Sequence, residues 1–129
     1  MDIIGNGVDI IKNSRINNSI KTKGFLNRIF TKKEIEQGKK LKNKINYYAK
    51  RFAAKEAFVK AIGTGFRSEI NFIDIEIKNY KNGKPYILLS RKLKNFIKEK
   101  FKIQKYKVFL SLSDEKEFSI AFVVIDKKI

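Results

Sequence analysis

The most informative stretch of the sequence runs from Arg51 to Gly65 and reads RFAAKEAFVKAIGTG. Its composition predicts a helix over Tyr47 to Ile62, which the glycines that follow bring to an end. Ala53, Ala57 and Ala61 recur every four residues and therefore form a column of small side chains on one side of this helix. Such a column allows the helix to approach a sheet closely.

The neighbouring column of the same helix carries charge, because Glu56 and Lys60 are also four residues apart. A carboxylate beside the apolar side of a helix is costly to desolvate unless it is paired or bound to a metal. Lys60 can supply the pairing. Taken alone, this spacing is more often an ordinary surface ion pair than part of a site.

A second carboxylate stands in the segment Gly5-Asn6-Gly7-Val8-Asp9-Ile10. Aspartate is depleted in strands, so Asp9 is unusual within a stretch of β-branched residues, although a lone aspartate can also cap a turn. Asp9 and Glu56 together would make a hard oxygen site suited to Mg²⁺. Sequence spacing does not show that the two residues meet.

The remaining segments predict one antiparallel α+β domain over residues 1–129, because the strands cluster late in the chain. Thr31 and Glu34 form a capping box within the first predicted helix. Asn82-Gly83 is a hairpin turn signal, and Asn82 to Pro85 could also receive a phosphate or an adenine edge on its amides and Lys84. We expect strands at Ile3–Ile11, Phe72–Ile77, Tyr86–Leu89, Tyr106–Ser113 and Phe118–Ile125, and further helices at Phe25–Leu41 and Arg91–Phe101.

Composition excludes several kinds of chemistry. The chain has no cysteine and no histidine, so disulfides, thiolate metal sites and imidazole-based catalysis are ruled out. We see no signal peptide and no apolar run long enough to cross a membrane, and we expect a cytoplasmic protein without a membrane partner. The net charge of +17 favours an acidic partner, although 25 of the 30 basic residues are lysine and compositional drift explains it equally well.

Five segments together carry a resemblance to a known family. They are Gly7-Val8-Asp9-Ile10, Phe25-x-x-Arg28-Ile29-Phe30-Thr31-x-x-Glu34, the Arg51 to Gly65 stretch, Asn82-Gly83-Lys84-Pro85 and Ser111-Leu112-Ser113. In this order, over nearly the whole chain, they resemble the holo-acyl-carrier-protein synthases, the short branch of the 4′-phosphopantetheinyl transferases. The resemblance implies the family's α+β fold, a homotrimer with active sites between subunits, and transfer of phosphopantetheine from coenzyme A to a serine of an acidic acyl carrier protein, in support of fatty acid biosynthesis.

The resemblance also implies roles for individual residues. Asp9 and Glu56 match the positions that hold Mg²⁺, and Lys60 matches a catalytic lysine near the coenzyme A pyrophosphate. Without histidine, Glu56 is our candidate for the base that takes the serine proton, directly or through water. Coenzyme A is expected to contact Lys60, Gly63, Thr64, Gly65, Asn82, Gly83, Lys84 and Pro85, and the carrier protein is expected to contact Arg15 and Arg28.

One residue departs from the family pattern, and two other functions compete with the transferase. Asp114 stands where the family has a histidine near the nucleotide phosphate, so that contact does not carry over, and either Lys116 compensates or Asp114 turns away. A nucleic-acid-binding domain would explain the lysines around Arg91 to Lys102, but these also suit the solvated face of a helix, and we expect no nucleic-acid partner. A structural or chaperone-like subunit would leave Asp9 and Glu56 without a role.

Overall fold

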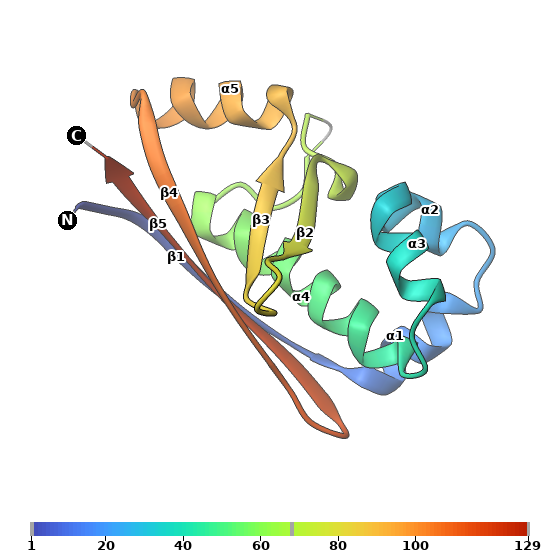
Figure 1. Cartoon of the computed structure of the whole chain (residues 1–129). Coiled ribbons are helices and arrows are strands. Elements are labelled where there is room, and N and C mark those ends of the chain that lie inside the picture. Colours follow the sequence, from blue (N-terminus) through green and yellow to red (C-terminus); the bar gives the residue numbers. More distant parts are fainter. Residues whose placement is uncertain (1, 68, 129) are drawn as a thin grey trace.

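The computed structural model describes residues 2–67 and 69–128 and has an antiparallel α+β architecture (Figure 1). A long three-stranded sheet crosses one side of the molecule, and a central helix lies against it with the smaller elements beyond. Along the chain the elements are β1 (Asp2–Lys12), α1 (Asn13–Ile20), α2 (Phe25–Ile29), α3 (Lys32–Lys39), α4 (Lys44–Ile62), the 3₁₀ turn η1 (Phe72–Asp74), β2 (Ile75–Asn79), β3 (Pro85–Leu89), α5 (Arg91–Phe101), β4 (Lys105–Asp114) and β5 (Phe118–Lys128).

The three-stranded sheet joins the two ends of the chain. Its strand order is β1-β5-β4, and both pairings are antiparallel. β1 alternates between its two faces, so that Gly7 and Ile11 are buried against the helical layer while Val8 and Ile10 are exposed on the other side. Asp9 shares the helix-facing side with Gly7 and Ile11, because side chains two residues apart point the same way.

Helix α4 lies in the centre of the molecule and packs closely against the sheet, as the column of alanines predicts. The Asn43 side chain caps its first turn by accepting from the Asn46 amide, and Gly63 ends it in the left-handed conformation with φ +76°. Ala53 and Ala57 are fully buried and Ala61 nearly so. The predicted helix is therefore confirmed and begins three residues earlier than expected.

Two predicted elements differ from the observed ones. The helix expected over residues 25–41 is divided, because Phe30 is extended and Thr31 starts a new helix with the predicted capping box. The strand expected from Phe72 begins only at Ile75, because the Asp74 carboxylate accepts from the Asn71 amide and closes a 3₁₀ turn. Helix α1 is not predicted at all, since its asparagines and serines favour turns over helix.

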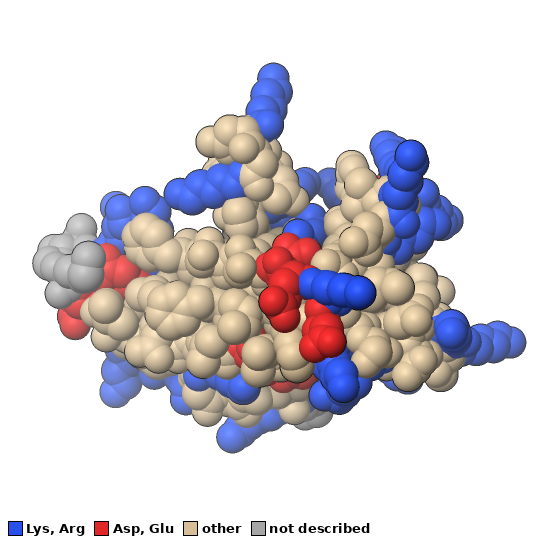
Figure 2. Space-filling view, turned by 90° about the horizontal axis from the view of Figure 1, so that it is seen from below, with Lys and Arg blue, Asp and Glu red and all other residues tan. Residues whose placement is uncertain are grey.

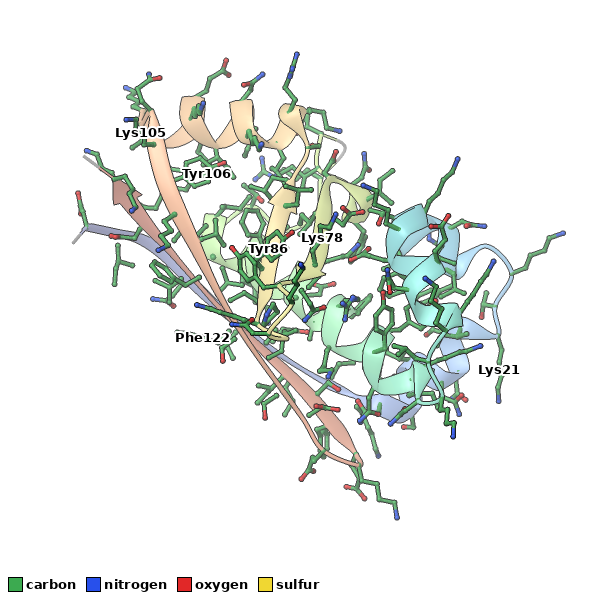
Figure 3. The ribbon with its side chains drawn as sticks, in the orientation of Figure 1. Lys21, Lys78, Tyr86, Lys105, Tyr106 and Phe122 are labelled. Atoms are coloured by element: carbon green, nitrogen blue, oxygen red, sulfur yellow. The ribbon has the colours of Figure 1, made fainter. Side chains whose placement is uncertain are left out.

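The far side of the three-stranded sheet is exposed and apolar. Figure 2 shows a broad area without charged side chains on this side, and Figure 3 places Phe122 on the side of the sheet that faces away from α4. Val8 pairs with Phe122 and Ile10 with Ile120, so the apolar side chains form rows across the strands. The exposed set comprises Ile3, Val8, Ile10, Phe109, Phe118, Ile120 and Phe122.

No helix in residues 2–67 and 69–128 has the length and hydropathy needed to cross a membrane.

Candidate active site

Close packing between β1 and α4 brings the two predicted carboxylates together. A Cβ atom built on Gly7 would lie 2.0 Å from the Ala57 carbonyl oxygen, and one built on Gly5 would lie 1.9 Å from that of Ala61. Backbone therefore touches backbone, which glycine on the strand alone permits. Asp9 lies two residues beyond Gly7, and Glu56 immediately precedes Ala57, so this contact places them on facing elements.

Lys60 bonds to Asp9 rather than to Glu56. The Lys60 Nζ atom donates to Asp9 Oδ1 at 3.0 Å and to the Val8 carbonyl oxygen at 3.1 Å. Within the described residues the Glu56 carboxylate has no hydrogen-bond or ion-pair partner. The helical Glu56–Lys60 pair suggested by the spacing is therefore replaced by a contact across elements, and the Glu56 carboxylate stays available.

The surroundings of Glu56 raise the pKa of its carboxyl group. Burial raises the pKa of the half-buried Glu56 carboxyl above its ordinary value, and the nearby Asp9 charge raises it further, while Lys60 and Arg15 oppose the shift. A raised pKa brings a carboxylate closer to the range in which it can accept a proton in catalysis. The effect of Asp9 on the Glu56 pKa also indicates that the two carboxylates lie close together.

The donor set fits Mg²⁺ better than a metal enclosed by protein ligands. In the described part of the chain no group of three or more histidine, cysteine, aspartate or glutamate residues is placed to hold a metal ion. Asp9 and Glu56 offer two hard carboxylates at a partly open position, and Mg²⁺ typically binds one or two carboxylates together with waters and substrate phosphates. A divalent cation bound between the two carboxylates would offset the repulsion between their negative charges.

The glycine loop predicted to contact coenzyme A lies next to this site. Gly63, Thr64 and Gly65 begin three residues after Lys60, and the Gly63 and Thr64 amides donate to the carbonyl oxygens of Lys60 and Val59 in the last turns of α4. Gly63 and Gly65 both have positive φ, and among the described residues, sequence neighbours aside, no atom lies within 4 Å of the Cβ position of either. The loop is therefore an open, tightly turned end of the helix that carries Glu56 and Lys60.

The second predicted coenzyme A loop lies elsewhere. Asn82 to Pro85 form the exposed turn between β2 and β3, where Gly83 has φ +92° and Asn79 Nδ2 donates to the Gly83 carbonyl oxygen at 2.9 Å. Asn79 in turn accepts from Arg51 Nη2 at 2.7 Å. Arg51 and Lys60 are separated by about two and a half helical turns and so lie on opposite sides of α4. One chain therefore does not bring this loop to Asp9 and Glu56.

A cavity of about 680 Å³ lies beside Asn79, on the Arg51 side of α4. Arg51 is 7% exposed, and its guanidinium lies 3.8 Å from the centre of the Tyr47 ring. Its buried Nε atom has no hydrogen-bond partner among the described residues. A buried guanidinium beside a cavity is suited to an anionic group, and sequence reasoning did not select Arg51 for that role.

Asp114, the departure from the family pattern, is held by α4. Its Oδ2 atom accepts from Asn46 Nδ2 at 2.7 Å, and Oδ1 lies 3.4 Å from Lys50 Nζ. Lys50 also lines the cavity beside Arg51. The carboxylate is therefore paired with a cation from the same chain, which reduces its repulsion of an anion in the cavity.

The predicted carrier-protein contacts lie on the helices beyond the sheet. Arg15 is exposed on α1 and close enough to Glu56 to affect its pKa, and Arg28 is exposed on α2. Lys21 and Lys23 stand exposed between these helices, and Figure 3 shows Lys21 at the end of the molecule far from the sheet. These four cations therefore gather on the helical side of the molecule, where Arg15 comes near Glu56.

The chain is similar to known proteins over nearly its whole length. The profile of the 4′-phosphopantetheinyl transferase superfamily matches residues 5–123. A holo-[acyl-carrier-protein] synthase of Pelagibacter ubique is 52% identical over 99% of this chain and 100% of its own, and one of Ehrlichia chaffeensis is 47% identical over 95% and 96%. The solved structure of a holo-(acyl-carrier-protein) synthase from Bacillus anthracis in complex with CoA (3′,5′-ADP) has a TM-score of 0.83 at 38% identity and covers 99% of this chain and 100% of its own. The chain described here belongs to the 4′-phosphopantetheinyl transferase superfamily.

Proposed function

We propose that this protein is a holo-acyl-carrier-protein synthase, which transfers 4′-phosphopantetheine from coenzyme A to a serine of apo acyl carrier protein in support of fatty acid biosynthesis. The observation that carries the proposal is the meeting of Asp9, Glu56 and Lys60 at the β1–α4 contact. The relatives of matching length, all named for this activity, support it.

The reaction is a phosphoryl-type transfer, in which positioning and charge neutralisation supply most of the catalysis. The serine hydroxyl oxygen attacks the β-phosphorus of coenzyme A, the bond from that phosphorus to the bridging oxygen breaks, and adenosine 3′,5′-bisphosphate leaves. Glu56 accepts the serine proton, directly or through water, and Lys60 stabilises the charge on the departing side. Asp9 and Glu56 would hold Mg²⁺, which neutralises phosphate charge when bound.

A direct experiment tests the activity. Apo acyl carrier protein is incubated with coenzyme A, Mg²⁺ and this protein, and the carrier is weighed by mass spectrometry. A phosphopantetheine increment on the carrier serine is expected, and its absence with several apo carriers would reject the proposal. Titration with duplex DNA at matched salt tests the competing nucleic-acid function, since we expect no tight, specific complex. We place the reaction in the cytoplasm.

We further propose that the enzyme is a homotrimer whose active sites lie between subunits. The exposed apolar face of the β1-β5-β4 sheet is large enough to favour burial against another copy. The turn at Asn82 to Pro85 and the cavity beside Arg51 lie on the side of α4 opposite Lys60. We therefore expect a neighbouring subunit to supply these nucleotide contacts to the site at Asp9 and Glu56.

Phe122→Lys is expected to break this assembly, because it places a charge in the middle of the apolar sheet face. Sedimentation should then show monomers, and activity should fall on the order of a hundredfold, since half of each site would be lost. Ile73→Lys is the matched control, because Ile73 is similarly exposed but belongs to η1. A wild-type enzyme that is fully active as a monomer would contradict the proposal.

Arg28→Glu tests docking of the acidic carrier protein. Arg is suited to bidentate contact with carboxylates, so reversing its charge should raise the Michaelis constant for the carrier about tenfold, with little change in that for coenzyme A. The effect should weaken at high salt. Arg91→Glu is the control, because Arg91 is exposed on α5 and its substitution changes the net charge by the same amount as Arg28→Glu. Equal losses in both variants would mean that the basic surface acts only through its overall charge.

A further inference from the structure

Two opposite charges are buried side by side in the middle of the molecule. The Lys55 side chain is 0% exposed and that of Glu34 is 1% exposed, and Lys55 Nζ lies 2.6 Å from Glu34 Oε1. Burying such a pair costs desolvation that apolar side chains of the same size would avoid. The reaction described above uses neither residue, so the pair needs a separate explanation.

The Lys55 ammonium and both carboxylate oxygens of Glu34 are hydrogen-bonded further, and the partners come from different elements. Lys55 Nζ also donates to the Ile29 carbonyl oxygen at 2.8 Å and to the Phe72 carbonyl oxygen at 3.3 Å. Glu34 Oε1 accepts from the Thr31 amide and Oε2 from the Ile77 amide, each at 2.9 Å. One ion pair therefore ties the end of α2, the start of α3, the turn η1 and strand β2 to α4.

The pair lies between Arg28, which we expect to bind the carrier protein, and Glu56, which we expect to act in catalysis. Lys55 is the residue before Glu56, and Ile29 is the residue after Arg28. Successive helical residues point about 100° apart, so Lys55 turns toward α2 while Glu56 turns toward β1. The hydrogen bond from Lys55 Nζ to the Ile29 carbonyl oxygen therefore links the helix of the docking arginine to the helix of the catalytic carboxylate, beside the ring contact between Phe25 and Phe52.

We infer that the buried Glu34–Lys55 pair is a positioning device, which fixes the docking helix α2 relative to Glu56 so that a bound carrier presents its serine in register with coenzyme A. This inference rests on the proposed transferase function. A short apolar contact would hold the helices together, but directional bonds to fixed backbone oxygens also set their relative position along the axis. Burial lowers the pKa of the Lys55 ammonium and Glu34 opposes the shift, as expected for a pair whose charges depend on one another.

Two variants test the inference. Lys55→Met removes the bond to Ile29 but leaves Glu34 charged and unpaired, which threatens folding. The double variant Glu34→Gln with Lys55→Met removes both charges and keeps most of the shape. In folded protein of either kind, the Michaelis constant for the carrier should rise about tenfold or more, because small misplacements cost up to about a hundredfold. The Michaelis constant for coenzyme A should stay within about twofold, since Asp9, Glu56 and Lys60 remain on α4 and β1.

Lys92→Met is the control, because it breaks the ion pair of the exposed Lys92 with Asp74 at 3.2 Å and removes no bond of Lys55 or Glu34. A merely structural pair would lower the folded fraction without moving either Michaelis constant. An unchanged carrier constant in both variants, or equal rises for both substrates, would overturn the inference.

Hydrogen exchange separates this inference from the transferase proposal. Loss of the pair should speed exchange of the Phe30 and Thr31 amides at the end of α2 at least tenfold, while the amides between β1 and β5 keep their protection. If the wild-type protein modified no carrier, the transferase proposal would fail, and faster exchange at these amides would still support a fixed α2. Unchanged exchange there would reject the device whatever the activity.

Discussion

Asp9→Asn and Glu56→Gln should each reduce phosphopantetheine transfer on the order of a thousandfold while leaving the fold intact. A metal-bound, charge-neutralised phosphate accounts for several kcal/mol of transition-state stabilisation, and each 1.36 kcal/mol is worth about a factor of ten in rate. The asparagine of the first variant can still accept from Lys60 through its amide oxygen, and the second variant removes no hydrogen bond within the described residues. Transfer is measured as the rate of carrier modification at saturating coenzyme A and Mg²⁺.

The control for these variants is Glu99→Gln, which neutralises an exposed carboxylate on α5. It should leave the rate within about twofold of wild type, because surface substitutions away from a site have small effects. Circular dichroism and the unfolding midpoint verify that all three variants fold. Near-normal activity of both site variants at low Mg²⁺ would mean that Asp9 and Glu56 do not form the site.

Substitutions of Gly7 should strongly lower the free energy of unfolding. A methyl group there would lie 2.0 Å from the Ala57 carbonyl oxygen, which belongs to the backbone of a buried helix and cannot turn aside. Overpacking of a well-packed core costs about 1–3 kcal/mol or more, so Gly7→Ala should lose at least about 3 kcal/mol and Gly7→Val should fail to fold. Urea denaturation measures the free energy of unfolding.

Gly24→Ala is the matched control, because it separates packing from backbone strain. Gly24 has φ +85°, but its Cβ position meets no atom within 4 Å in the part of the chain that the structure describes, sequence neighbours aside. Only the strain of a left-handed residue remains, which costs about 1–2 kcal/mol. If Gly7→Ala were no more harmful than Gly24→Ala, the close approach of β1 to α4 would not be what brings Asp9 to Glu56.

Local sequence patterns predicted the elements whose signals lie within a few residues. The spacing of the alanines predicted α4, and Gly63 marked its end. Thr31 and Glu34 form the predicted capping box. Patterns failed where a side chain changed the backbone: the Asp74 carboxylate turned the start of an expected strand into η1, and Thr31 divided one expected helix into α2 and α3.

The sequence by itself determined which side chains are available for the proposed chemistry: carboxylates at Asp9 and Glu56, an ammonium group at Lys60, and neither histidine nor cysteine to replace them. Only the tertiary structure decided how they combine. Lys60 pairs with Asp9 across two elements, because Gly7 lets β1 touch α4, and this contact joins residues about fifty positions apart. The pairing of Glu34 with Lys55 was hidden from the sequence for the same reason. The spacing of charged residues in the sequence predicts only which of them are neighbours along one helix. Whether a charged side chain is buried, and which residue it pairs with, depends on segments that meet only after the chain has folded.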